Sequence, residues 1–135
     1  MSADKLNLIA KKLCEKPKGI LAADESTNTI KKRFDSINVE SNFEMRRAYR
    51  ELLFKTPNLK NFISGVILFD ETIRQEDSEK TPLAKYLLDN DIIPGIKVDT
   101  GAIHLEKNSQ EKLTEGLDGL ETVSYTHLRA HETVV

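Results

Sequence analysis

Apolar residues recur near the start of the chain at close to helical spacing. Leu6, Ile9 and Leu13 fall on one side and lysines on the other, which predicts an amphipathic helix over residues 3–15. The Pro-Lys-Gly sequence at residues 17–19 ends this helix. The chain therefore begins with a helix that has one apolar face to bury.

Three later runs are short and almost continuously apolar. They lie at residues 19–24, 65–71 and 93–99, and each ends in charged or polar residues. Runs of this length predict strands buried on both faces. Helical patterns at residues 28–36, 42–55 and 81–90 separate them. After the third run, a polar loop is predicted at 101–115, and a further helix is predicted to start within 114–120.

Strands that are apolar on both faces and are joined by helices pair in parallel, so the fold class is predicted to be α/β. Three such strands leave both edges of a sheet open. A closed barrel of alternating strands and helices takes about 250 residues. We therefore expect the 135 residues to be the front part of a larger domain.

Charge and composition argue against several classes of function. The 20 basic and 22 acidic residues give a net charge of −2, which argues against a nucleic-acid partner or a membrane-surface role. No apolar run reaches the roughly 20 residues that cross a bilayer. The one cysteine excludes an internal disulfide framework and is typical of a reducing cytosol. The expected location is the cytoplasm.

Polar groups follow the predicted strands at their carboxyl ends, where parallel α/β proteins bind ligands. Asp24 follows the first strand, and Lys97 and Asp99 lie in the third. Alternation places Lys97 and Asp99 on one face of their strand and Asp24 on the face of Ala22. A lysine near carboxylates can hold a phosphate or a sugar hydroxyl. The competing interpretation is that Asp24 caps the next helix and Lys97 is a solvated strand end, and spacing alone slightly favours it.

Hydroxyl and arginine side chains offer a second set of candidates. Ser26 and Thr29 lie at a strand-to-helix turn that suits a phosphate, or they serve only as helix caps. The arginines of residues 46–50 could hold a phosphate, but their spacing favours a solvated helix face. No glycine-rich phosphate loop is present, and the His127 and His131 pair lacks the glutamate of the H-E-x-x-H motif. No metal site is predicted.

Five segments, in order and at family-like spacing, resemble class I fructose-bisphosphate aldolase. They are GILAADEST at 19–27, RRAYRELL at 46–53, GVILFDET at 65–72, GIKVDTG at 95–101 and TEGLDGL at 114–120. The first and fourth together are highly specific. The resemblance implies a TIM (β/α)8 barrel, of which this chain would form about three βα units. It also implies reversible cleavage of fructose 1,6-bisphosphate to dihydroxyacetone phosphate and glyceraldehyde 3-phosphate in glycolysis.

The resemblance assigns roles to six residues. Asp24 matches the aspartate that handles the C4 hydroxyl and proton movement, and Lys97 matches a lysine that holds substrate near it. Ser26 matches a serine at the C6-phosphate end, and Thr29 replaces a second serine while keeping a hydroxyl. Arg33 and Arg46 match basic residues on the substrate side. The family uses a lysine Schiff base and neither cofactor nor metal, and its full-length members are homotetramers.

The family-like pattern runs from about Asp4 to Leu120 and then stops. Residues 121–135 are predicted to be a non-family tail of artefactual or disordered character. The lysine that forms the Schiff base would lie beyond this chain, so we expect the chain to be inactive alone. The alternative is a non-catalytic aldolase remnant that acts as a binding or docking fragment.

Overall fold

The computed structural model describes residues 2–104 and 110–115. The chain divides into two compact units, residues 1–96 and 97–135. In the first unit the helices are α1 (Ala3–Leu13), α2 (Thr27–Asp35), α3 (Phe43–Phe54), α4 (Asp70–Ile73) and α5 (Leu83–Asp89), with a 3-10 turn η1 at Leu59–Asn61. Its strands are β1 (Gly19–Ala23), β2 (Ile63–Leu68) and β3 (Ile93–Ile96).

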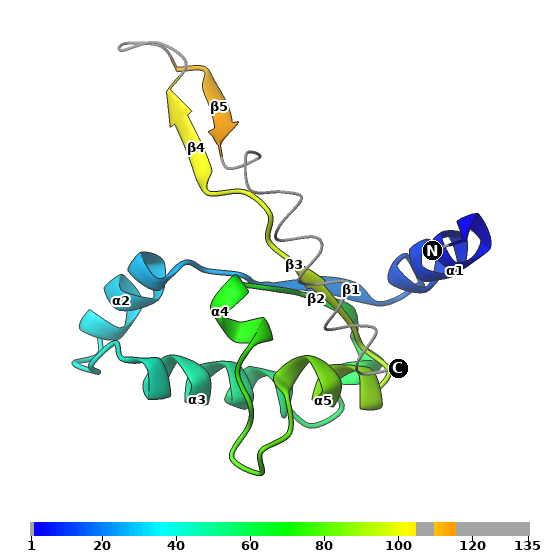
Figure 1. Ribbon diagram of the computed structural model, residues 1–135, viewed down its shortest axis with the longest axis horizontal. Coiled ribbons are helices and arrows are strands. Elements are labelled where there is room, and N and C mark those ends of the chain that lie inside the picture. The colour runs from blue at the N-terminus through cyan, green and yellow to red at the C-terminus, as the bar shows by residue number, and fades with distance from the viewer. Residues whose placement is uncertain (1, 105–109, 116–135) are drawn as a thin grey trace. The chain divides into compact units, whose positions relative to one another are not determined.

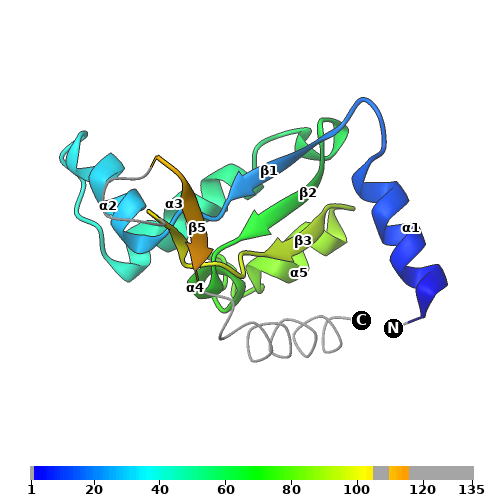
Figure 2. The ribbon, with the colours of Figure 1, turned by 90° about the horizontal axis from the view of Figure 1, so that it is seen from above.

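The three strands form one parallel sheet in the order β1-β2-β3 (Figure 2). Ala23 pairs with Leu68, and Leu68 pairs with Ile96, so the carboxyl ends of all three strands lie in one row. Helices α2 and α3 connect β1 to β2, and α5 precedes β3. The α/β class and the parallel pairing predicted from the apolar runs are confirmed.

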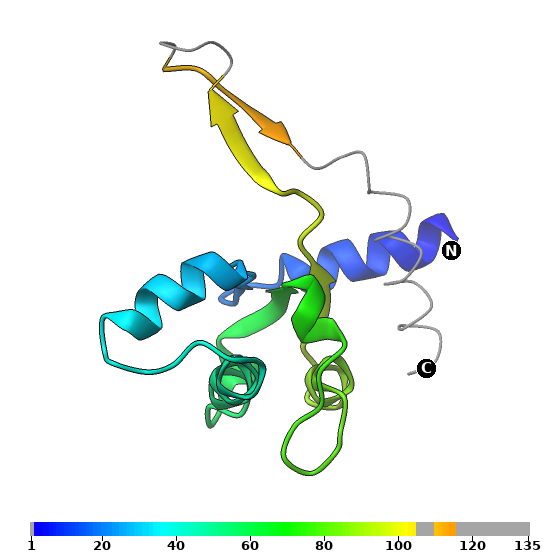
Figure 3. The same cartoon turned by 60° about the vertical axis from the view of Figure 1, so that its left-hand side comes forward.

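Helices α3 and α5 lie side by side along one face of this sheet (Figures 1 and 3). Ala23, Val66 and Leu68 point toward them and are buried. The core is completed by residues of the helices and of the segment before β3, namely Phe54, Ile73, Leu83, Ala84, Leu87 and Ile92. Burying these side chains supplies most of the driving force for folding of this unit.

The other face of β1 is open. Ile20 is 51% exposed and Ala22 is also exposed. The next residue, Ala23, is fully buried. This alternation is that of a strand with helices on one side only. Asp24, the predicted catalytic carboxylate, directly follows the last residue of β1.

Helix α1 packs closely against β2 at Gly65. A Cβ added to Gly65 would come within 2.5 Å of Leu13 Cδ2 and 3.2 Å of the Ile93 carbonyl oxygen. Ser64 donates a hydrogen bond of 2.7 Å to the Leu13 carbonyl oxygen at the end of α1. The predicted helix is confirmed, but it ends at Leu13, and none of its residues is buried although the sequence predicts an apolar face to bury. Its last turn contacts the sheet.

Two helix starts agree with the sequence. Ser26 caps α2 by accepting from the Thr29 N–H at 3.4 Å, and Asn42 caps α3 by accepting from the Met45 N–H at 2.9 Å. These caps satisfy N–H groups that the first turn of a helix leaves unpaired. The helix cap considered for Ser26 in the sequence is confirmed.

Three predicted segments are wrong in their extent. The second strand is Ile63–Leu68 rather than 65–71, because Asp70 and Glu71 start the short helix α4. The third strand ends at Ile96, so alternation along a strand does not apply to residues 97–99. The predicted loop at 101–115 contains an antiparallel hairpin of β4 (Gly101–His104) and β5 (Lys112–Glu115).

Residues 114–115, where the sequence predicts the start of a helix, belong to strand β5 instead. The rest of that predicted helix lies outside the described residues, as do the tail at 121–135 and the histidine pair. Polar strands such as β4 and β5 are easily missed, because their alternation is weaker than that of the buried strands.

Candidate active site

Asp24 stands at the carboxyl end of β1 and is half-buried. It directly follows the row in which Ala23, Leu68 and Ile96 align across the sheet. Burial lowers the pKa of the Arg50 guanidinium in α3, and the negative charge of Asp24 is one of the charges that oppose this shift. The carboxylate therefore lies at the edge of the sheet where ligands collect in parallel α/β proteins.

Ser26 and Thr29 lie together at the start of α2. Their hydroxyl oxygens are 3.1 Å apart, and the Thr29 N–H also donates to Ser26 Oγ. The first turn of a helix directs N–H groups outward and favours negative charge. The structure thus brings together two of the predicted substrate residues in an arrangement able to contact a phosphate, while the cap interaction is present as well.

Glu25, between Asp24 and Ser26, joins three side chains that come from α2 and α3. Arg33 Nη1 is 2.5 Å from its Oε2, and the Tyr49 hydroxyl donates to the same oxygen at 3.3 Å. Arg50 Nη1 is 3.9 Å from Oε1, an ion-pair distance that is too long for a hydrogen bond. Arg33, a predicted substrate residue, is therefore paired with Glu25 at the surface.

Arg50 lies near this site, and nothing in the sequence singles it out from the other arginines of residues 46–50. It is only 2% exposed, and its Nη2 donates to the Glu25 carbonyl oxygen at 2.8 Å. Burial lowers the pKa of its guanidinium, and the charge of Glu25 opposes that shift. Because an arginine stays charged in a protein, the pair is a buried ion pair rather than a neutral contact.

Arg46 is held by a carboxylate from another element. Its Nε and Nη2 donate to the two oxygens of Glu71 in α4, at 2.8 and 3.0 Å. This two-point contact raises the pKa of Arg46, chiefly through the hydrogen bond. The guanidinium is thus fixed near the carboxyl end of β2. Its predicted role toward substrate stays a prediction.

The interpretation of residues 46–50 as a solvated helix face is wrong. Arg50 is buried, and the side chains of Arg46 and Arg47 are each 14% exposed. Arg47 bonds to Glu44 and Glu51 of its own helix. The helical spacing was read correctly, but it could not show that each of these cations meets an acid. Glu71 of α4 pairs with Arg46, two acids of α3 pair with Arg47, and Glu25, after β1, pairs with Arg50.

Lys97 begins the second unit and pairs with Asp99 at 2.9 Å. Both side chains are half-buried. The two charges predicted to share a face are thus in contact, although they follow strand β3 and are not part of it. Asp24 belongs to the other unit, and the predicted cooperation of Lys97 with Asp24 stays a prediction.

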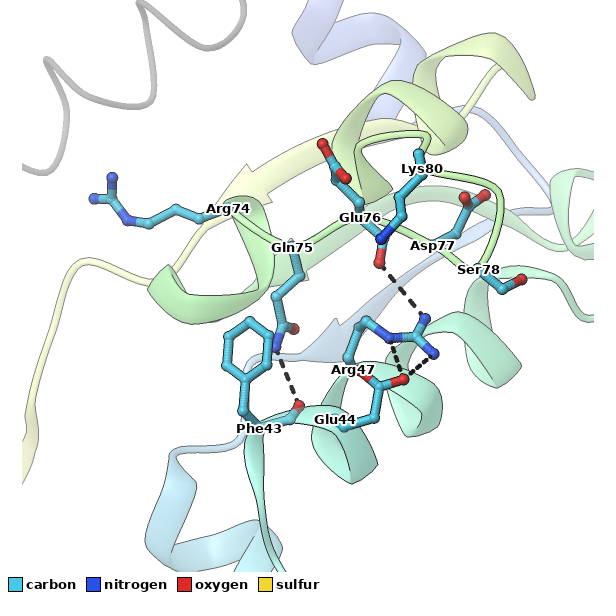
Figure 4. Close-up of a pocket in the computed structure, with 9 residues that line it drawn as sticks. All are labelled: Phe43, Glu44, Arg47, Arg74, Gln75, Glu76, Asp77, Ser78 and Lys80. Atoms are coloured by element: carbon cyan, nitrogen blue, oxygen red, sulfur yellow. Dashed lines mark hydrogen bonds and ion pairs between the residues drawn. The ribbon is translucent and has the colours of Figure 1, made fainter.

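A separate cavity of about 460 Å³ lies between the start of α3 and the segment after α4 (Figure 4). Its walls are tied by Gln75, which donates to the Phe43 carbonyl oxygen at 3.4 Å, and by Arg47, which reaches the Glu76 carbonyl oxygen at 3.5 Å. The cavity contains none of the six predicted site residues. It is not where the sequence places the chemistry.

Within residues 2–104 and 110–115, no group of three or more histidine, cysteine or acidic side chains is placed to hold a metal ion. In the same residues, no helix has the length and apolar character needed to cross a membrane.

Parallel strands joined by helices, with polar side chains at their carboxyl ends, place the chain in the class of α/β proteins. Comparison with known proteins makes the class specific. The family model for class I fructose-bisphosphate aldolase matches residues 5–131. The chain belongs to the class I fructose-bisphosphate aldolase family.

Individual relatives agree with this assignment. A probable fructose-bisphosphate aldolase class 1 of Xanthomonas campestris is 55% identical over 120 residues, which is 89% of this chain and 36% of that protein. A fructose-bisphosphate aldolase of Plasmodium falciparum is 52% identical over 118 residues, 87% of this chain and 33% of that protein. The chain spans about a third of the length of these relatives.

A solved structure supports the fold. The fructose-bisphosphate aldolase of Plasmodium falciparum, in a ternary complex with TRAP and a small-molecule inhibitor, matches with a TM-score of 0.87 and 48% identity. The match covers 96% of this chain and 38% of that chain. The resemblance read from the five sequence segments is confirmed at the level of the family.

Proposed function

We propose that this chain supplies the first three βα units of a (β/α)8 barrel and, with them, part of the active site of a fructose-bisphosphate aldolase. The observation that carries the proposal is the position of Asp24, directly after the carboxyl end of β1 and beside the row in which the three strands end. In a closed barrel the face away from the helices is the interior, and ligands bind at the carboxyl ends of the strands.

In the proposed reaction, fructose 1,6-bisphosphate is cleaved reversibly to dihydroxyacetone phosphate and glyceraldehyde 3-phosphate. Asp24 accepts a hydrogen bond from the C4 hydroxyl and assists movement of its proton. Ser26 and Thr29, at the start of α2, hold the C6 phosphate through their hydroxyls and the N–H groups of the first turn. Lys97 adds a positive charge toward the substrate, and Arg33 and Arg46 add two more.

The class I reaction runs through a Schiff base between the substrate ketone and a lysine, and it takes no metal or other cofactor. We propose that this nucleophilic lysine is not among the lysines of this chain, so the chain alone does not turn over substrate. We place the enzyme in the cytoplasm and, from its family, in a homotetramer.

Borohydride trapping tests this proposal. The purified chain is incubated with dihydroxyacetone phosphate, reduced with borohydride and examined by intact-mass spectrometry, beside the full-length Plasmodium falciparum aldolase as a positive control. We expect an adduct on the control and none on this chain. An adduct on any lysine of the chain would overturn the assignment of the nucleophile.

A further inference from the structure

One buried cation connects helix α3 to the segment that carries the proposed catalytic residues. Arg50 Nη2 donates to the Glu25 carbonyl oxygen at 2.8 Å. That carbonyl belongs to the peptide group that joins Glu25 to Ser26, and a peptide group is planar and rigid. The contact therefore fixes the orientation of the chain immediately before Ser26.

The side chain of Glu25 is held at the same time. Arg50 Nη1 lies 3.9 Å from its Oε1, and Tyr49 and Arg33 both contact its Oε2. Glu25 follows Asp24 directly, so the segment between the proposed acid–base residue and the proposed phosphate residue is restrained through its main chain and its side chain.

Arg50 itself has little freedom to move. It is 2% exposed, and its guanidinium lies 5.4 Å from the centroid of the Tyr49 ring. The Tyr49 ring in turn packs edge-on against Phe34 of α2, with centroids 5.7 Å apart. A cation enclosed in this way acts as a fixed support, unlike an exposed arginine that samples many rotamers.

We propose that Arg50 is a positioning residue, which orients Asp24 and Ser26 toward the substrate by holding the carbonyl group and the carboxylate of Glu25. This inference rests on the proposed function and adds to it a residue that does not contact substrate. Arg50 Nη2 donates to the carbonyl oxygen of Glu25, while Nη1 lies at ion-pair distance from its carboxylate.

Hydrogen–deuterium exchange of the full 135-residue chain tests the proposal. The readout is deuterium uptake by a peptide spanning residues 24–30, with and without inorganic phosphate. In the parent chain we expect phosphate to lower this uptake. In Arg50→Met we expect faster uptake without phosphate, and a phosphate concentration for half-protection that is higher by about tenfold or more, because a hydrogen bond from a charged donor is lost.

Two further variants separate positioning from general stability. Arg50→Lys keeps the charge and one hydrogen bond, so we expect it to recover most of the phosphate response. Arg47→Met removes an arginine of the same helix that pairs with Glu44 and Glu51, and it should leave the 24–30 peptide unchanged. A peptide from β2 should exchange alike in all variants.

Three results would overturn the proposal. They are parent-like uptake and phosphate response in Arg50→Met, an equal effect in Arg47→Met, or a loss of protection in Arg50→Met that extends to β2. If phosphate has no effect on the parent chain, the proposed role of Ser26 and Thr29 fails. Uptake without phosphate still decides whether Arg50 positions the segment.

Discussion

Carboxylates that organise their surroundings are the main feature at the scale of single residues. Glu25 gathers Arg33, Tyr49 and Arg50 beside the candidate site. Asp77 does the same in the segment after α4. It is 4% exposed, accepts hydrogen bonds from the N–H groups of Glu79 and Thr81 at 2.8 and 2.9 Å, and pairs with Lys55, the C-cap of α3, at 3.0 Å.

Removing the carboxylate of Asp77 should loosen the segment after α4. Asp77→Ala leaves two backbone N–H groups without their acceptor, each at a cost of about 1–3 kcal/mol where it stays out of water. We expect the free energy of unfolding, measured by urea titration, to fall by an amount on the order of 2 kcal/mol. Glu79→Ala, at an exposed neighbour, is the matched control and should change it little; equal losses would contradict the role of Asp77.

Ionisation of Glu51 should make the free energy of unfolding depend on pH. Burial raises the pKa of its carboxyl, but hydrogen bonds from Arg47, Ser78 and Lys55 outweigh it and lower the pKa from 4.5 to about 2. A pKa that is lower in the folded state stabilises the fold above the unfolded value. This stability should disappear as the pH falls from about 4.5 to about 2.

Urea titrations from about pH 5 to about pH 2 would measure this effect, because they span the unfolded and folded pKa values of Glu51. We expect the unfolding free energy of Glu51→Gln to depend less steeply on pH than that of the parent chain. The exposed Glu79→Gln is the control and should follow the parent. A parent-like slope in Glu51→Gln would show that another group sets the acid sensitivity.

At the scale of elements, the contact between α1 and β2 is closely packed at Gly65. Gly65→Ala would place a methyl group 2.5 Å from Leu13 Cδ2 and 3.2 Å from a backbone oxygen of β3. We expect a loss of unfolding free energy of about 1–3 kcal/mol and faster hydrogen exchange in α1.

Gly95→Ala on the neighbouring strand provides the control for this substitution. Its added Cβ would lie 3.6 Å from the nearest atom, which is ordinary contact, so the change should be small. Leu13→Ala should partly rescue Gly65→Ala, because it removes the atom in closest conflict. If Gly95→Ala costs as much as Gly65→Ala, close packing at Gly65 is not the cause.

The elements also show what a sequence can and cannot predict. The existence of the three apolar strands and the cap at Ser26 could be predicted, because apolar runs and cap residues are local signals. The open face of β1 could not, because the predicted burial on both faces depends on neighbours outside the run. The end of β3 before Lys97 and the hairpin of β4 and β5 could not, because polar strands carry a weak pattern. The pairing of Glu25 with Arg50 joins positions 25 residues apart and has no local signal at all.

At the scale of the whole chain, the open face of β1 and the outer edges of β1 and β3 are the surfaces that a complete barrel would cover. Ile20 is more than half exposed on that face, and exposed apolar patches and unpaired edges favour association. We expect the chain to enhance the fluorescence of the dye anilinonaphthalene sulfonate more, mole for mole, than the full-length Plasmodium falciparum aldolase. No enhancement would indicate that the open face is covered in solution.

The proposal that this chain contains a working part of an aldolase active site is tested most directly by a chimera. The matched segment of this chain replaces the corresponding segment of the Plasmodium falciparum aldolase, to which it is 52% identical over 118 residues. Cleavage of fructose 1,6-bisphosphate is then measured. We predict an active chimera, and a kcat that falls about 10²- to 10⁴-fold in Asp24→Asn, the size expected for loss of a general acid–base group. A folded chimera without activity, or one whose kcat is unchanged by Asp24→Asn, would contradict the account.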